Sequence, residues 1–330
     1  DRDVARAADS VKRVIRLGIA GCGEVAAEKH MPALAEIPGI SVEAVADTDS
    51  ARLDYVKRRH GVKHRYANLQ QLLAHDGLDA IAMCLPPSLQ ADSAIASIEA
   101  GRHVWIDPPI ALSLGDCDRV IQCAAECNRV AMAGFHMRWH RLVRQARGVI
   151  ASGRLGKLQT IRGVWNSPRN EDRLHEWRRY RATGGGALVE VAMDHFDLWR
   201  YLLSDEILDI QALALQGRWE DESAVVSGRM NSGILFSAVF SERAGHDIEI
   251  EVAGKEGRLR LSLVRFEGLE FYPTAMMPSS GRARVGRLAH FARELPRAIP
   301  GMRKAGDYRA SYRDQWKHFY DCIVDGASTA

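Results

Sequence analysis

A short apolar segment followed at once by closely spaced glycines is the feature that most restricts the fold of this chain. Residues 14–20 (Val-Ile-Arg-Leu-Gly-Ile-Ala) have the length and composition of a buried parallel strand, and Gly21-x-Gly23-x-x-Ala26 follows directly. In such a pattern the first glycine makes a tight turn, the second lets a pyrophosphate approach the backbone, and a small third residue lets a helix pack closely. Amide groups and the dipole at the start of that helix favour an anion. The pattern predicts a strand–turn–helix unit that binds a dinucleotide.

Strand-like and helix-like segments alternate through residues 13–133. After the first strand and a helix over 25–36, we expect strands over 41–46, 79–84, 103–106 and 130–135 and helices over 51–60, 69–74 and 88–100. This alternation is typical of a doubly wound parallel sheet. It predicts an α/β Rossmann domain.

The second half of the chain has a different period. Strand-length segments occupy 158–166, 207–216, 223–230, 234–241, 247–253 and 257–263, with helices expected over 142–152, 187–203 and 312–324. In 247–252, three aliphatic residues alternate with three acids, as in a strand with two different faces. We expect an α+β domain with an open, mostly antiparallel sheet. A chain of 330 residues is long enough for two domains, which we place at 1–133 and 134–330.

Composition excludes several classes of protein. No apolar run reaches 18 residues, so no membrane span is expected, and a net charge of +3 gives no reason to expect a nucleic-acid partner. The six cysteines show neither a CxxC pair nor the spacing of a disulfide framework, which favours the cytoplasm. Cys123 and Cys127 are four apart and could suit a metal, but no histidine or acid at matching spacing shares their helix face, so no metal site is expected. The basic excess is local, and either a solvated helix face or an anion-binding surface fits it. It comprises Arg282, Arg284, Arg287, Arg293, Arg297, Arg303 and Lys304.

Asp47 ends the second predicted strand, 24 positions after Gly23. An acid at this position accepts a hydrogen bond from the ribose 2′-hydroxyl of NAD and repels the 2′-phosphate of NADP. Thr48 and Asp49 add no arginine that would offset the repulsion. We therefore expect NAD as the cofactor, although a glycine loop kept only for packing would leave the same pattern.

The stretch Ala100-Gly-Arg-His-Val-Trp-Ile-Asp107-Pro108-Pro109-Ile-Ala111 carries a family resemblance. It resembles the Gly-Lys-His-Val-x-x-Glu-Lys-Pro-x-Ala signature of the glucose–fructose oxidoreductase/inositol dehydrogenase (Gfo/Idh/MocA) family. In that family the lysine is the usual catalytic acid/base. Here Asp107 stands in place of the glutamate, and Pro108, with no titratable group and no backbone N–H, stands in place of the lysine.

Three further motifs carry the same resemblance. Residues 84–90 are similar to the family's Thr-Pro-x-x-x-His, with Gln90 in place of the histidine. Residues 134–139 are similar to Gly-Phe-Asn-x-Arg-Phe, with His136 in place of the asparagine. Residues 177–197 resemble Trp-Arg…Gly-Gly-Gly-x-Leu-x-Asp-x-Gly-x-His-x-x-Asp, with Glu190 and Asp194 in place of an aspartate and a histidine.

These motifs give the candidate site residues. The resemblance implies cofactor contacts from the glycine loop, the second strand and two later loops: Gly21, Cys22, Gly23, Glu24, Val25, Asp47, Leu85, Pro86, Gln90, Asp107 and Pro108. The candidate catalytic residues are Asp194, Glu190 and His136.

Two carboxylates one helical turn apart, as at 190 and 194, share a face and can repel until one proton is shared, which would raise one pKa. His195 lies about 100° further round the helix and would not share that face. For His136, proton transfer and a purely structural role both fit.

The resemblance implies an NAD(H)-dependent oxidoreductase acting on a sugar, a polyol or a similar polar metabolite with an altered acid/base set. An NAD-assisted lyase or hydrolase is an alternative. So is a catalytically inactive relative that binds NAD or a metabolite as a sensor or assembly subunit. A homo-oligomer, a dimer or a tetramer, is also expected, through the open face of the second sheet.

Overall fold

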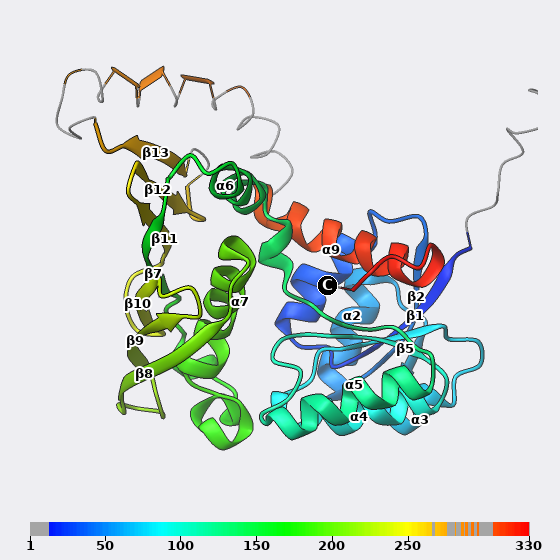
Figure 1. Ribbon diagram of the computed structural model, residues 1–330. Coiled ribbons are helices and arrows are strands. Elements are labelled where there is room, and N and C mark those ends of the chain that lie inside the picture. The colour runs from blue at the N-terminus through cyan, green and yellow to red at the C-terminus, as the bar shows by residue number, and fades with distance from the viewer. Residues whose placement is uncertain are drawn as a thin grey trace, which may run out of the picture.

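The computed structural model describes residues 13–265, 268–275 and 306–329, together with scattered positions between 281 and 296. It contains two sheets, each with helices packed against it (Figure 1). Of the basic residues at 282–304, only Arg293 lies within the described residues, and its side chain is exposed. In this part of the chain no helix is both long and apolar enough to cross a bilayer.

The first sheet has six parallel strands in the order β3-β2-β1-β4-β5-β6. The strands are β1 (Ile15–Ala20), β2 (Ile40–Ala46), β3 (His64–Tyr66), β4 (Ala80–Met83), β5 (His103–Ile106) and β6 (Ala131–Ala133). The helices between them are a π-helical segment η1 (Ala26–His30), α1 (Met31–Leu34), α2 (Ser50–His60), α3 (Leu69–Leu73), α4 (Pro87–Glu99) and α5 (Leu114–Glu126). The strand order reverses between β1 and β4, and ligands of such sheets bind at this switch point, beyond the carboxyl ends of the strands.

The second sheet has seven strands in the order β13-β12-β11-β7-β10-β9-β8, with only β10 and β7 parallel. Its strands are β7 (Leu158–Asn166), β8 (Ile207–Leu215), β9 (Ser223–Met230), β10 (Leu235–Ser241), β11 (Asp247–Gly254), β12 (Gly257–Ser262) and β13 (Leu269–Pro273). The helices of this part are α6 (Arg141–Ala151), α7 (Ala192–Leu203) and the short segments η2 (His136–Trp139), η3 (Glu171–Arg173), η4 (Glu176–Arg179), η5 (Arg181–Thr183) and η6 (Ala187–Val191). The predicted fold class, a Rossmann sheet followed by a mostly antiparallel sheet, is confirmed.

Most differences from the predicted elements lie where the backbone departs from a regular helix or where a strand is short. The helix expected over 187–203 is a π-helical segment η6 followed by α7, and the one expected over 25–36 contains the π-helical η1. Strands β3 and β13 were not predicted, because segments of three and five residues, respectively, show too little periodicity.

The last helix, α9 (Gly306–Val324), packs against the first sheet although it comes from the far end of the chain (Figure 1, red). Trp316 is fully buried, with its ring centroid 4.5 Å from that of Trp105 on β5. Tyr320 also belongs to this core, and its hydroxyl donates to the backbone oxygen of Arg13 at 3.0 Å. The core around β1 thus includes a helix that the predicted division at 133/134 assigns to the second domain.

We expect Trp316→Ala to lower the free energy of unfolding by about 3–5 kcal/mol, because it removes a fully buried indole and leaves a cavity beside Trp105. Urea denaturation measures this change. Lys317→Ala, one position along the same helix, is the control, since its side chain is 66% exposed and its loss should cost less than about 1 kcal/mol. Similar costs for the two variants would contradict this role for α9.

Candidate functional site

The glycine loop has the geometry that a dinucleotide phosphate site requires. Gly21 has a φ of +93°, and an added Cβ there would lie 2.2 Å from the backbone oxygen of Cys84. An added Cβ at Gly23 would meet nothing within 4 Å, so the loop is open on that side. The helix begins directly after it, and its first amides have no partner within the helix. The loop therefore fits an anionic group at the helix start.

Asp47 closes this loop. One of its carboxylate oxygens accepts from the amide of Cys22 at 2.7 Å and the other from the amide of Asp49 at 2.8 Å. Burial raises the pKa of the Cys22 thiol to about 12, and the Asp47 charge acts in the same direction, so this cysteine stays a neutral thiol. Asp47 is thus held at the end of β2, where an acid can meet a ribose.

Arg52 is a residue of this region that the sequence analysis missed. It extends from the first turn of α2 and places Nη1 3.7 Å from Asp47 Oδ2. The same guanidinium lies 3.2 and 3.3 Å from the ring nitrogens of His175, in the second half of the chain. The sequence pattern considered only positions 48 and 49, and Arg52 lies one helical turn further along the chain. Asp47 is therefore next to a cation.

The loop after β5 is braced by Gln90. Its Nε2 donates to the backbone oxygens of Asp107 at 2.6 Å and of Pro109 at 3.1 Å, and its side chain is buried. The Pro108–Pro109 peptide bond is cis. Gln90 was expected to contact the cofactor, and in this structure its amide shapes the loop that carries Asp107.

His136 is the first residue of η2, and its ring packs against α9. Its ring is stacked on Tyr312 with a centroid distance of 4.0 Å, and burial holds its pKa well below the usual range. Ser311 donates its hydroxyl proton to the Tyr308 carbonyl at 2.7 Å, so its oxygen accepts from His136 Nδ1 at 2.9 Å. These contacts make His136 a neutral, structurally fixed ring.

Glu190 on η6 is surrounded by guanidinium groups. It forms ion pairs with Arg178 and, at 2.5 Å, with Arg169, which also lies 3.1 Å from Glu242. Burial lowers the pKa of Arg178 to about 10, and the charge of Arg169 adds to this. The Glu190 charge is therefore compensated twice.

Asp194 is half-buried at the start of α7, and no ion pair to it occurs among the residues that the structure describes. Burial raises its pKa to about 8, and the charges of Asp197 and Asp107 act in the same direction. Asp197 is itself paired with Arg138 through bonds of 2.5 and 2.8 Å. The electrostatic partners of Asp194 thus differ from the expected one, because two arginines neutralise Glu190.

His195 points away from this group, as expected from its position on the helix. It is fully buried against the second sheet, with Nε2 3.3 Å from the backbone oxygen of Glu249, and burial lowers its pKa to about 4. Across the described ranges no cluster of three or more His, Cys, Asp or Glu side chains could hold a metal ion.

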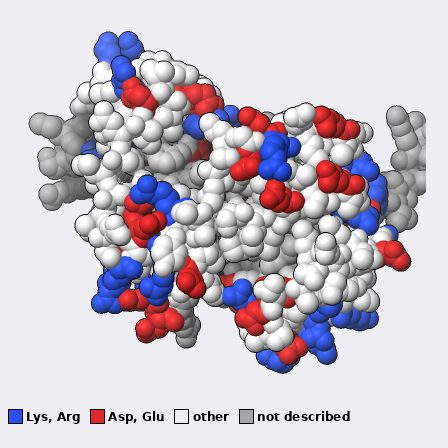
Figure 2. Space-filling view, turned by 90° about the horizontal axis from the view of Figure 1, so that it is seen from below, with Lys and Arg blue, Asp and Glu red and all other residues white. Residues whose placement is uncertain are grey.

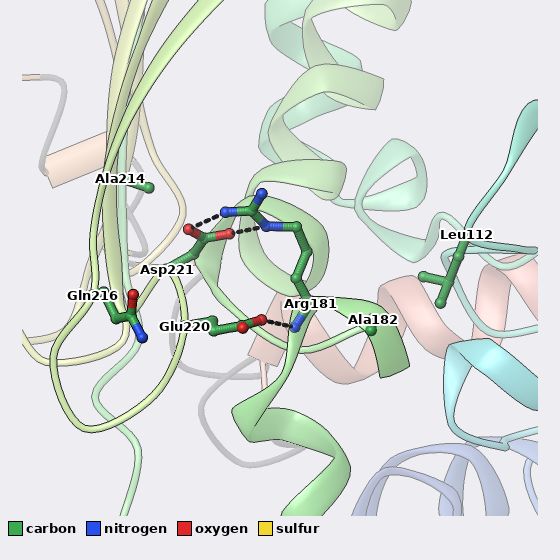
Figure 3. A pocket seen from close by; sticks show the side chains of 7 residues that line it. All are labelled: Leu112, Arg181, Ala182, Ala214, Gln216, Glu220 and Asp221. Atoms are coloured by element: carbon green, nitrogen blue, oxygen red, sulfur yellow. Dashed lines mark hydrogen bonds and ion pairs between the residues drawn. The ribbon is translucent and has the colours of Figure 1, made fainter.

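An open pocket of about 650 Å³ lies apart from these groups (Figure 3). It is lined by Leu112, Arg181, Ala182, Ala214, Gln216, Glu220 and Asp221. Arg181 pairs through two bonds of 2.7 Å with Asp221, and its amide donates to Glu220 at 2.6 Å. Arg181, Glu220 and Asp221 are therefore engaged with one another in this pocket.

Comparison with known proteins places both halves of the chain. Residues 15–135 match the model described as "Oxidoreductase family, NAD-binding Rossmann fold", and residues 143–260 match the "GFO/IDH/MocA C-terminal domain". The chain is 26% identical to myo-inositol 2-dehydrogenase of Thermotoga maritima over 96% of its own length and 90% of that protein. It is 22% identical to scyllo-inositol 2-dehydrogenase (NAD(+)) of Bacillus subtilis over 77% and 75% of the two chains.

Among solved structures, the WlbA dehydrogenase from Bordetella pertussis, in complex with NADH and UDP-GlcNAcA, has the same fold. The TM-score is 0.78 at 20% identity, with 96% of this chain and 90% of that one covered. The two matched models, the Thermotoga maritima relative that spans nearly the whole chain and the two observed sheets all indicate the same family. The chain belongs to the Gfo/Idh/MocA family of NAD-dependent oxidoreductases.

Proposed function

We propose that the protein transfers a hydride between NAD(H) and a sugar, an inositol or a similar polyol, with Asp194 exchanging the substrate proton. The observation that carries this proposal is the half-buried Asp194 carboxyl, which has no arginine partner among the described side chains. The related inositol dehydrogenases support the substrate class.

The residues present fit the cofactor. The open side of Gly23 and the helix start behind it would hold the pyrophosphate, and Asp47 would hold a ribose hydroxyl. NAD, when bound, supplies the hydride acceptor or donor. Leu85, Pro86 and the 107–109 loop follow β4 and β5, at the carboxyl edge of the sheet where such ligands bind.

Asp194 supplies the proton chemistry that Pro108 cannot. Alcohol oxidation releases a hydroxyl proton, and a carboxylate with a pKa near the working pH is an effective acceptor for it. In the reverse direction the neutral carboxyl donates that proton to the carbonyl oxygen. Glu190 and His136, the other candidate catalytic residues, would position substrate or the helix around Asp194, because Glu190 is ion-paired and His136 is held neutral.

A second candidate is an inactive relative that binds NAD or a metabolite. The proline at 108 and the structural engagement of Gln90 and His136 favour it. Restoring the family's groups by Pro108→Lys with Asp194→His separates the two. New polyol-dependent NADH formation from an inert parent would show this second function.

The rate of polyol oxidation should rise with pH up to about 8, while the rate of the reverse reduction should fall above the same pH. The sign follows from the raised pKa of Asp194, because oxidation needs its ionised form and reduction its neutral form.

We expect Asp194→Asn to lower kcat by about 10²- to 10⁴-fold and leave NAD binding intact. NADH absorbance with myo- or scyllo-inositol measures this. Asp76→Asn, which changes an exposed acid in the domain of the first sheet, is the control, and an active parent indifferent to Asp194→Asn would refute the assignment.

NAD(H) should bind at least about tenfold more tightly than NADP(H), a difference of about 1.4 kcal/mol, because the Asp47 carboxylate repels a 2′-phosphate. Asp47→Ser should reverse this preference, since it leaves Arg52 free to pair with that phosphate. Arg52→Ala in the same background should cancel the gain. Calorimetric titration with both nucleotides is the measurement. Equal or tighter NADP(H) binding by the wild type would contradict the prediction.

We also propose that two copies associate through the open face of the second sheet. The aliphatic side chains of the 247–252 segment, Ile248, Ile250 and Val252, are buried within the chain and do not form this face. The exposed apolar row lies instead on β8, β9 and β10, where Leu213 pairs with Val225 and Val225 with Val239. On β7, β11 and β12 the side chains form ion pairs instead, such as Arg162–Glu251 and Arg260–Glu249. This surface combines apolar and paired charged groups. On the underside of the molecule, which Figure 2 shows, charges of both signs are likewise interspersed.

Val225→Asp with Val239→Asp should shift the protein to a monomer, because two buried carboxylates would oppose association of the two faces. Light scattering at micromolar concentration tests this. Leu114→Asp, an 85% exposed leucine on α5, serves as the matched control and should leave the oligomer intact. A wild-type monomer under these conditions would rule out the interface.

A further inference from the structure

His30 is a buried histidine to which neither the motifs nor the proposed mechanism assigns a role. It lies at the end of η1, is fully buried, and is surrounded by aromatic rings. Its centroid is 4.6 Å from that of Trp105, 5.0 Å from Tyr312 and 5.7 Å from Trp316. A polar ring placed so deeply in an aromatic core needs a hydrogen-bonding reason.

The contacts of His30 fix its proton. The indole N–H of Trp316 can only donate, and it donates to His30 Nδ1 at 3.1 Å. Nδ1 is therefore the acceptor nitrogen, and a histidine with an unprotonated Nδ1 carries its proton on Nε2. That N–H is buried and has no hydrogen-bond partner among the residues described.

The atom that the Nε2–H faces is a carboxylate oxygen of Asp107. The distance from Nε2 to Oδ1 is 3.7 Å, slightly longer than a hydrogen bond. Gln90 Nε2 donates to the backbone carbonyl oxygen of Asp107, and this bond holds the Asp107 backbone in place. The Asp107 side chain is 31% exposed and thus also borders the open part of the site. A small rotation of the carboxylate would satisfy the buried N–H.

The groups that act on Asp194 come from three elements. On its own helix, Asp197 is neutralised by Arg138. On α9, burial raises the pKa of both Tyr308 and Tyr312, so these phenols are neutral at neutral pH, and Lys29 lies over the Tyr308 ring. From the end of β5 comes Asp107, which has no arginine partner among the described residues. Its charge is the one that His30 can control.

We propose that His30 is a positioning residue whose buried Nε2–H turns to the Asp107 carboxylate 3.7 Å away and fixes its orientation, and that the Asp107 charge acts on Asp194 from there. The role in catalysis rests on the proposed function, whereas the coupling of the two carboxyls does not. In this arrangement the Asp107 charge acts on Asp194 through space. Asp107 directly precedes position 108, where the family motif has its lysine.

The test uses unfolding, which needs neither substrate nor turnover. Native Asp194 keeps a proton that the unfolded chain releases, so its contribution to the free energy of unfolding falls as pH rises and levels off above its native pKa. The difference between wild type and Asp194→Asn, measured by urea denaturation from pH 6 to 9.5, therefore gives the midpoint of Asp194. The same difference is then measured in backgrounds altered at 107 and 30.

In the Asp107→Asn background the midpoint should fall by roughly half to one pH unit, because the nearby negative charge is gone. His30→Leu should move it in the same direction, whereas His30→Gln, whose amide N–H can replace Nε2–H, should restore it toward the wild-type value. Should His30→Leu fail to fold, His30→Asn takes its place, since its shorter amide does not reach Asp107. His64→Leu, which removes an exposed imidazole of the same domain, is the control and should leave the midpoint unchanged.

An unchanged midpoint in Asp107→Asn overturns the coupling. A shift in Asp107→Asn with none in His30→Leu or His30→Asn overturns the role of His30 and leaves it a packing residue. Absence of turnover with every polyol would instead count against the proposed function alone. In an active protein, the pH profile of kcat should move with the unfolding midpoint.

Discussion

The packing of α9 against the first sheet is the interaction on which the rest of the site depends. Trp316 fills the core beside Trp105 and also donates to His30, while Ser311 and Tyr312 fix His136. A single helix from the end of the chain thus orders side chains that belong to η1 and η2. Because aromatic burial supplies the stabilisation, the buried polar rings can be held in one tautomer and one orientation.

Charge compensation distinguishes the three carboxyl groups on η6 and α7 from one another. Glu190 has two guanidinium partners and Asp197 has one, so both carboxyl groups are held in fixed places. Asp194 lacks such a partner among the described residues, and burial raises its pKa to about 8. Carboxylates on neighbouring turns therefore differ in chemistry through their surroundings, and the arginines come from segments distant in sequence.

Family membership and local chemistry rest on different residues. The glycine loop, the two sheets and the matched family models agree on an NAD-dependent oxidoreductase fold. At positions 90, 108, 136 and 194, however, this chain has residues other than those of the motifs it resembles. Around these positions, Gln90 anchors the loop after β5, and the Pro108–Pro109 peptide bond in that loop is cis. The same scaffold can therefore present different side chains at these positions.

The sequence by itself determined the parts that follow from local patterns. Strand periodicity predicted the edges of β7 and β9, and the glycine spacing predicted the turn after β1, because backbone geometry acts over a few residues. The partners of the site residues were decided only by the tertiary structure. Arg52 beside Asp47, the two arginines around Glu190 and His30 facing Asp107 are contacts between side chains far apart in the chain or on different elements. The pKa of Asp194 depends on burial and on such neighbours, and no spacing in the sequence encodes either.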